Sequence, residues 1–194
     1  MKGIIFNLTE LAVTNELGED MWDLLLEDAG VDGVYSAIGD YPTSELAALA
    51  SAAANRLDLP IDDTLRWIGF HVMTPLAERY PDFFSAFADS ISFLETLDGV
   101  IHQEVRKLYE GARPPRVEVE ALGPDRALVT YRSIRCLDAL AEGMLEGTAA
   151  HFGQQLTLER HEVPDQELPT VAFQCHFTHL PAESTSCRST PTMG

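Results

Sequence analysis

Three polar side chains occupy alternate positions in one short segment, namely Tyr131, Ser133 and Arg135. At β-strand spacing, alternate side chains point to the same face, so a phenol, a hydroxyl and a guanidinium are expected to converge. Together they supply several hydrogen-bond donors and one fixed positive charge, which suits one or two carboxylates or a phosphate. The segment therefore predicts an anion-binding site, although an exposed strand end whose arginine pairs with a surface glutamate would leave the same pattern.

A second candidate is His102, which lies on or beside the apolar stripe of a predicted long helix, one turn before Val105 and two turns before Tyr109. These neighbours favour burial of the ring. A buried imidazole can bind iron or zinc through a nitrogen lone pair, whereas a lone histidine on an apolar face can equally be a core residue that is hydrogen-bonded to a backbone carbonyl. Spacing alone leaves both interpretations open.

The first elements that must position these residues are helices. From residue 1 to about residue 111, apolar residues recur at three- and four-residue steps with no strand pattern between them. Pro75 is expected to kink or divide one of the helices, and Pro42, Thr43 and Ser44 are expected to cap another. Gly111 and the pair Pro114-Pro115 end this part. The main predicted helices cover residues 45–57, about 60–80 and about 90–109.

After this proline pair the period of the apolar pattern changes from 3.6 to 2. Two alternating runs separated by Gly123-Pro124-Asp125 predict a hairpin, and a helix and two further strands follow it. The predicted elements are strands over 117–121 and 127–133, a helix over about 136–154, and strands near 156–162 and 171–178. This order predicts an α+β fold, with a helical N-terminal part followed by an antiparallel sheet with an intervening helix.

The chain has 194 residues, 45% of them hydrophobic, a length and composition that favour one folded domain. We expect that domain over residues 1–180, and a Ser-, Thr- and Pro-rich tail over 181–194 to be disordered. Thirteen basic and 31 acidic residues give a net charge of −18, which argues against nucleic acid and anionic membranes as partners. No apolar run approaches the roughly 20 residues of a membrane span. The three cysteines form no C-x-x-C pair, so we expect reduced thiols and a cytoplasmic protein.

Several of these features in order resemble one family. The opening Met1-Lys2-Gly3-Ile4-Ile5, the helix with His102, the segment 111–116 with its proline pair, and Tyr131-x-Ser133-x-Arg135 are similar to the haem nitric oxide/oxygen binding (H-NOX) domain, which is related to the haem domain of soluble guanylate cyclase. The resemblance covers about residues 1–180. The Tyr-x-Ser-x-Arg motif alone would be weak evidence for the family. Because it follows the histidine and the proline pair in the same order as in the family, the resemblance is specific.

The resemblance implies haem b, iron protoporphyrin IX, buried between the helical part and the sheet part. His102 would then be the axial iron ligand, and Tyr131, Ser133 and Arg135 would hold the haem propionates. In family members, residues matching Pro115 and Ile5 pack against the porphyrin and distort it. The anion site and the metal site that the residues suggested separately would thus belong to one cofactor.

The selectivity for gases depends on the other side of the haem, where bound dioxygen needs a hydrogen-bond donor and nitric oxide needs none. Oxygen-binding relatives have a distal tyrosine at the position that matches Leu140, and leucine cannot donate. The other distal positions implied by the resemblance are Thr9, Val72, Met73 and Met144. Only Thr9 among these carries a hydroxyl, and it can bond to its own helix instead. The resemblance therefore implies a nitric oxide sensor that also could bind carbon monoxide.

The implied mechanism is weakening or loss of the iron bond to His102, which releases the helix that carries it. No part of the sequence resembles a cyclase or a kinase, so we expect signalling in trans, as in bacterial stand-alone relatives that regulate a histidine kinase or a diguanylate cyclase. The alternatives are an oxygen or redox sensor of the same fold, a haem carrier and a haem enzyme. An enzyme would need a polar acid/base pair beside the iron, which the implied distal residues lack.

A zinc site is a further possibility near the C-terminal strands. Some family members carry such a site, and His161, Cys175, His176 and His179 could suggest it. Asp138 and Pro164 stand where further cysteine ligands would be expected, so the spacing does not complete a closed four-ligand site.

Overall fold

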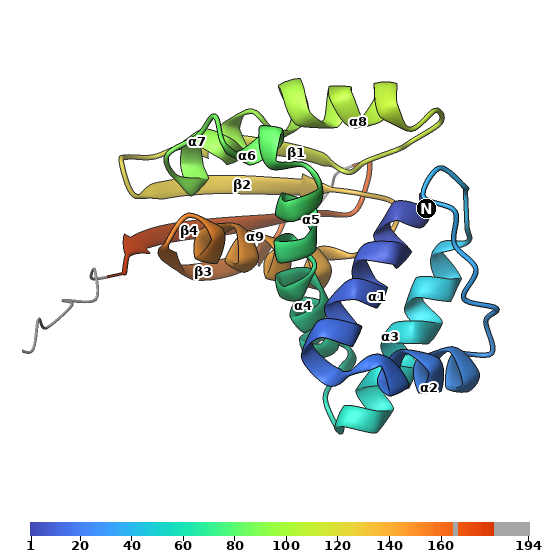
Figure 1. The fold of residues 1–194 in the computed structure, drawn as a ribbon. Coiled ribbons are helices and arrows are strands. Elements are labelled where there is room, and N and C mark those ends of the chain that lie inside the picture. Colours follow the sequence, from blue (N-terminus) through green and yellow to red (C-terminus); the bar gives the residue numbers. More distant parts are fainter. Residues whose placement is uncertain (165–166, 181–194) are drawn as a thin grey trace, which may run out of the picture.

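A computed structural model describes residues 1–164 and 167–180 of the chain. It has a helical N-terminal part followed by a four-stranded sheet with one helix inserted between its two hairpins (Figure 1). The predicted α+β fold is therefore confirmed. The predicted tail over 181–194 lies outside the described residues.

The N-terminal part begins with α1 (Gly3–Leu17), α2 (Glu19–Ala29) and α3 (Thr43–Leu57). The segment between α2 and α3 has no regular structure and folds back on the start of the chain, because the Lys2 ammonium donates to the Asp40 carboxylate at 2.7 Å and to the Ile38 carbonyl at 3.1 Å. Thr43 lies inside α3, and no side chain caps the helix, so the capping prediction was wrong in detail.

The predicted helix over 60–80 is two helices, α4 (Ile61–His71) and α5 (Met73–Arg79). They meet at Val72, three residues before the proline that was expected to divide them. Pro75 lies instead in the first turn of α5, where its missing N–H removes no helical hydrogen bond. The short α6 (Pro81–Phe84) follows directly.

The predicted long helix over 90–109 is divided into three pieces, α7 (Ser90–Glu95), a π-helical turn η1 (Leu97–Ile101) and α8 (His102–Leu108). The Thr96 carbonyl oxygen accepts from the N–H groups of both Val100 and Ile101, at 2.8 and 3.2 Å. Such wide turns often mark functional positions in helices. Here the turn immediately precedes the candidate metal ligand, His102.

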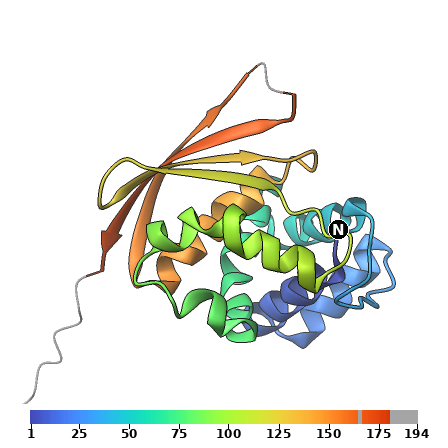
Figure 2. The ribbon, with the colours of Figure 1, turned by 90° about the horizontal axis from the view of Figure 1, so that it is seen from above.

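The sheet has the strand order β1-β2-β4-β3, and all of its neighbours are antiparallel. The predicted hairpin is confirmed as β1 (Arg116–Ala121) and β2 (Arg126–Arg132). The helix α9 (Asp138–His151) follows, and then come β3 (Gln154–Glu162) and β4 (Thr170–His179). Figure 2 shows the helices on one side of this sheet. Buried residues of that side, such as Val129 and Phe173, pack with α7 and α9 in one apolar core.

The helical part is joined to the sheet part through very close packing of α4 against α9. A Cβ on Gly143 of α9 would stand 1.9 Å from the backbone carbonyl oxygen of Arg66. A Cβ on Gly69 of α4 would stand 2.1 Å from the carbonyl oxygen of Leu140. The Arg66 guanidinium also pairs with Glu142 at 3.2 Å and with Glu146. The two backbones therefore touch, and the two helices form one rigid unit.

Within the described residues, none of the helices combines the length and the apolar content needed to cross a bilayer.

We expect Gly143→Ala to destabilise the protein by about 3 kcal/mol or more, because the added methyl group meets backbone that cannot move away cheaply. Urea unfolding followed by circular dichroism measures the effect. Gly123→Ala is the control, since its nearest neighbour, the Asp125 carboxylate, would lie 4.0 Å from the new Cβ. Equal unfolding midpoints for the two variants would contradict the packing described here.

Candidate functional site

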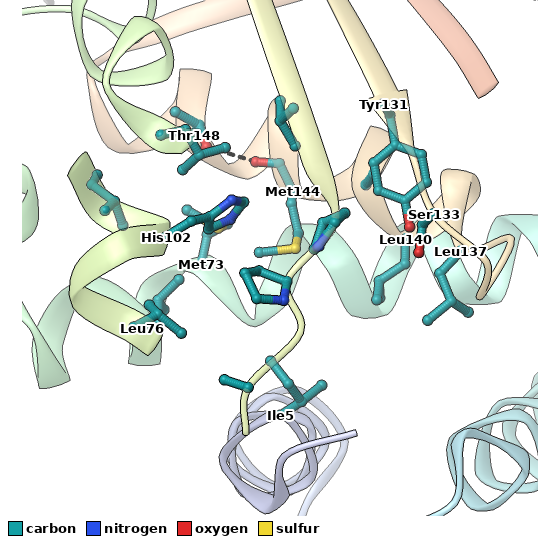
Figure 3. A pocket seen from close by; sticks show the side chains of 18 of the residues that line it. Ile5, Met73, Leu76, His102, Tyr131, Ser133, Leu137, Leu140, Met144 and Thr148 are labelled. Carbon is teal, nitrogen blue, oxygen red and sulfur yellow. Dashed lines mark hydrogen bonds between the residues drawn. The ribbon is translucent and has the colours of Figure 1, made fainter. Parts of the chain in front are cut away.

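A cavity with almost wholly apolar walls lies between the helical part and the sheet. Its volume is about 290 Å³, close to the lower end of the roughly 300–1,000 Å³ range of ligand pockets. Residues from α1, α5, the segment 93–109, the loop to β1, β2 and α9 form its walls. Figure 3 shows His102 on one side of this cavity and Tyr131 and Ser133 on the opposite side.

The imidazole of His102 enters the cavity at the first residue of α8 (Figure 3). The residue is largely buried, with a side chain 12% exposed, and burial lowers the pKa of the ring although the neighbouring Asp98 carboxylate opposes this shift. Nδ1 lies 3.1 Å from Asp98 Oδ1. An ionised carboxylate only accepts, so Nδ1 is the nitrogen that carries the proton. Among the described residues no hydrogen bond reaches Nε2, which therefore keeps a free lone pair.

Tyr131, Ser133 and Arg135 all border the cavity, but strand alternation explains only part of their convergence. β2 ends at Arg132, and Ser133 and Arg135 lie in the turn that follows. There the Ser133 hydroxyl accepts the Arg135 N–H at 3.2 Å, and the Arg135 guanidinium donates to the Arg113 carbonyl at 2.7 Å. Burial raises the pKa of Tyr131, whose residue is only 6% exposed. A phenol, a hydroxyl and a guanidinium are therefore available at one edge of the cavity.

Two further basic residues, Lys2 and Arg113, contribute to the walls of the same cavity. Lys2 is buried and is held by its ion pair with Asp40. The sequence analysis missed both residues as parts of a site. The only sequence feature that could have indicated Lys2 is its charge within the otherwise apolar start of the chain.

The residues expected on the distal side are divided by the structure into two groups. Met73, Leu140 and Met144 border the cavity. Ile5 and Pro115, which were expected to pack against the porphyrin, border it as well. Thr9 and Val72 are not among the residues that form its walls, and their role on the distal side stays a prediction. Thr9 is buried and its hydroxyl donates to the Ile5 carbonyl at 2.9 Å, within its own helix. Val72 packs in an apolar cluster between α1, α3 and α4.

A pair of tyrosines that the sequence analysis did not single out also borders the cavity. Tyr80, between α5 and α6, and Tyr109, directly after α8, share a hydrogen bond between their hydroxyl groups. Burial, with this hydrogen bond as the second cause, raises the pKa of Tyr109 to about 12. The pair ties the end of α8 to α5, and no periodicity along one segment could have indicated a contact between residues so far apart.

The residues considered for zinc do not gather in the part of the chain that the structure describes, where no group of three or more His, Cys, Asp or Glu side chains is placed to hold a metal ion. Burial raises the pKa of the Cys175 thiol to about 12, which opposes the thiolate that zinc requires. His176 instead pairs with Asp125 at 3.1 Å.

The arrangement fits a flat, largely apolar group that carries a metal ion at its centre and carboxylates at one edge. A neutral imidazole with a free lone pair is the usual histidine ligand of iron, and its second nitrogen commonly donates to a carboxylate, as it does here. Hydroxyl and guanidinium donors at the far side match carboxylates. The donor set and the apolar walls are those expected for haem.

Comparisons with known proteins point to the same group. The family model described as Haem-NO-binding matches residues 2–160. The fold is similar to that of an H-NOX protein from Shewanella oneidensis in its Fe(II)NO ligation state, with a TM-score of 0.82, 32% identity, and 92% of this chain and 100% of that chain covered. It is also similar to an Fe(II) unliganded H-NOX protein from K. algicida, with a TM-score of 0.79, 27% identity, and coverage of 94% and 99%. A search of curated proteins finds no match.

Tyr109 provides a test of the tyrosine pair through pH. Its pKa is about 12 in the folded protein and about 10 in the unfolded chain. The unfolded chain therefore loses the proton first, and stability falls as pH rises between these two values. We expect Tyr109→Phe to lose less stability than the wild type between pH 8 and pH 12 in urea unfolding. Parallel curves for the two proteins would show that the phenol of Tyr109 is not held as described.

Proposed function

From the premise that this chain belongs to the haem-NO-binding, or H-NOX, family, we propose that it is a haem-based sensor that is selective for nitric oxide. The observation that carries the proposal is the apolar cavity with the free Nε2 of His102 on one side and the hydroxyl and guanidinium donors of Tyr131, Ser133 and Arg135 on the other. Haem b supplies an iron centre that binds the gas.

In this proposal each group has one task. His102 is the axial ligand, and burial keeps its ring neutral and therefore able to ligate. Tyr131, Ser133 and Arg135 bind the propionates. Pro115 and Ile5 both border the cavity and pack against the porphyrin ring.

Selectivity for nitric oxide is supported by the side chains of the distal wall. Ile5, Met73, Leu140 and Met144 offer no hydrogen-bond donor there. The Thr9 hydroxyl lies outside the wall and is used within α1, while the Thr148 hydroxyl, which borders the cavity, donates to the Met144 carbonyl at 2.7 Å. Dioxygen, which depends on such a donor more than nitric oxide does, would be bound weakly.

In this proposal the response to nitric oxide would be release of His102, which would leave α8 free to move. Shifting a two-state population from 1:99 to 99:1 requires roughly 5.5 kcal/mol of differential affinity. Loss of a metal bond together with relief of strain from Pro115 and Ile5 can supply energy of this order. The signal would pass in trans to a histidine kinase or a diguanylate cyclase, and we propose the cytoplasm as its location.

A haem enzyme that processes oxidants is the second candidate, and the cavity favours the sensor over it. Such an enzyme uses a polar acid/base pair opposite the axial ligand. Among the described residues that form the cavity wall, His102 is the only histidine. No second histidine is therefore present there to act as the acid or base.

The ligand assignment is tested by His102→Gly. We expect the wild type to be purified with haem, with the absorption band of five-coordinate ferrous iron after reduction under argon. His102→Gly should lose the haem and regain it when free imidazole replaces the side chain. The control is His151→Ala, because His151 lies on α9 outside the cavity wall. A wild type that binds no added iron protoporphyrin, or a glycine variant that keeps haem without imidazole, would refute the assignment.

The selectivity is tested by Leu140→Tyr. We expect reduced wild type to bind nitric oxide and carbon monoxide and to show no stable binding of dioxygen in air. Leu140→Tyr adds a phenol to the distal wall, so it should gain dioxygen binding that the absorption spectrum detects. Leu140→Phe, which adds the ring without the hydroxyl, is the matched control. Stable dioxygen binding by the wild type would contradict the proposed selectivity.

A further inference from the structure

We propose that Asp98 sets the strength of the bond between His102 and the haem iron, and that Arg106 acts on the same carboxylate in the opposite direction. The inference rests on the proposed function, because it concerns His102 as an axial ligand. It assigns a positioning role to two side chains that do not themselves border the cavity.

The geometry begins with the π-helical turn before α8. Asp98 belongs to this turn, and its Oδ1 lies 3.1 Å from Nδ1 of His102, four residues further on. The side chains are 31% and 12% exposed, so the contact is partly sheltered from water on the side of the imidazole. The nitrogen that faces Asp98 is thus the one that does not face the iron.

This hydrogen bond changes the ligand at its other end. An imidazole that donates Nδ1–H to a carboxylate becomes more electron-rich at Nε2 and is a stronger base toward a metal. The axial bond and the hydrogen bonds around it are among the main controls that a protein has over haem iron. Asp98 therefore strengthens the very bond whose loss the proposed sensor uses.

Arg106 moderates this effect from the next turn of α8. Its Nη2 lies 3.8 Å from the same Oδ1 of Asp98, so its positive charge competes with the imidazole for the carboxylate. The side chain is 45% exposed, and water weakens the interaction, so its influence is smaller than that of Asp98. The strength of the ligand bond is thus a balance of two opposing charges, one in η1 and one in α8.

Glu104 provides a matched control on the same helix. It also carries a carboxylate close to His102 in sequence, but it pairs with Lys107 at 2.6 Å. Removing its charge alters the net charge of residues 97–108 by the same amount as removing that of Asp98. It does not touch the hydrogen bond to His102.

The experiment compares the haem-loaded full chain with Asp98→Asn, Arg106→Gln and Glu104→Gln. The iron–imidazole stretching frequency of the ferrous protein is measured by resonance Raman spectroscopy, and haem loss is measured by transfer to apomyoglobin. We expect Asp98→Asn to lower the frequency, to lose haem on the order of 10-fold faster, and to release His102 in a larger share of molecules when nitric oxide binds. Arg106→Gln should raise the frequency, and Glu104→Gln should match the wild type.

The possible outcomes separate this inference from the proposed function. A wild type without an iron–imidazole band refutes both. A wild-type band together with unchanged frequencies in Asp98→Asn and Arg106→Gln overturns the role of Asp98 and leaves the sensor intact. Shifts of both variants in the same direction indicate general loosening of α8 and also overturn it. Should Asp98→Asn fail to retain haem, the iron–imidazole stretching frequency of Arg106→Gln decides alone. A rise supports the role of Asp98, and an unchanged or lower frequency overturns it.

Discussion

A buried imidazole surrounded by apolar side chains stays neutral and keeps one nitrogen lone pair available, and the elements of this protein are arranged around that constraint. His102 meets it because burial lowers the pKa of its ring, while the Asp98 carboxylate accepts a hydrogen bond from Nδ1–H. The hydrogen bond from Nδ1 fixes the orientation of the ring, and Nε2 remains free. The apolar walls then exclude water from the side where a metal would bind.

The helix that carries this imidazole is held by polar contacts at its two ends. At its start, Asp98 in the π-helical turn bonds to His102, and directly after its end Tyr109 bonds to Tyr80. Between them α8 has no fully buried residue. A helix attached mainly at its ends is suited to movement when one attachment is lost. By contrast, α9, which borders the cavity, is packed backbone to backbone against α4.

The two ends of the cavity also differ in charge, in a protein whose net charge is −18. Arg113, Arg135 and Lys2 gather at its walls, and Tyr131 and Ser133 add hydroxyl groups. Local positive charge of this kind would favour the two carboxylates of the proposed cofactor in an otherwise acidic protein. In the proposed function, His102 of the helical part and the hydroxyl and guanidinium donors of the sheet part would therefore bind the same cofactor.

Much of this could be predicted from the sequence, because it is expressed in local patterns. The change of apolar period after Pro114-Pro115 indicates the α+β order, and residue types indicated chemistry at His102 and at Arg135. Other features depend on which side chains compete for the same space. The Thr9 hydroxyl donates to the Ile5 carbonyl within α1. Val72 packs in an apolar cluster with residues of α1, α3 and α4.

The sequence by itself determined the order of the elements, the neutral apolar setting of His102 and the donors of the anion site, because periodicity and side-chain chemistry act over a few residues. Only the tertiary structure decided the break at Val72, the π-helical turn that joins Asp98 to His102, and the tyrosine pair that ends α8. Their physical reason is packing between elements distant in the chain, which selects among helix geometries and hydrogen-bond partners of similar local energy.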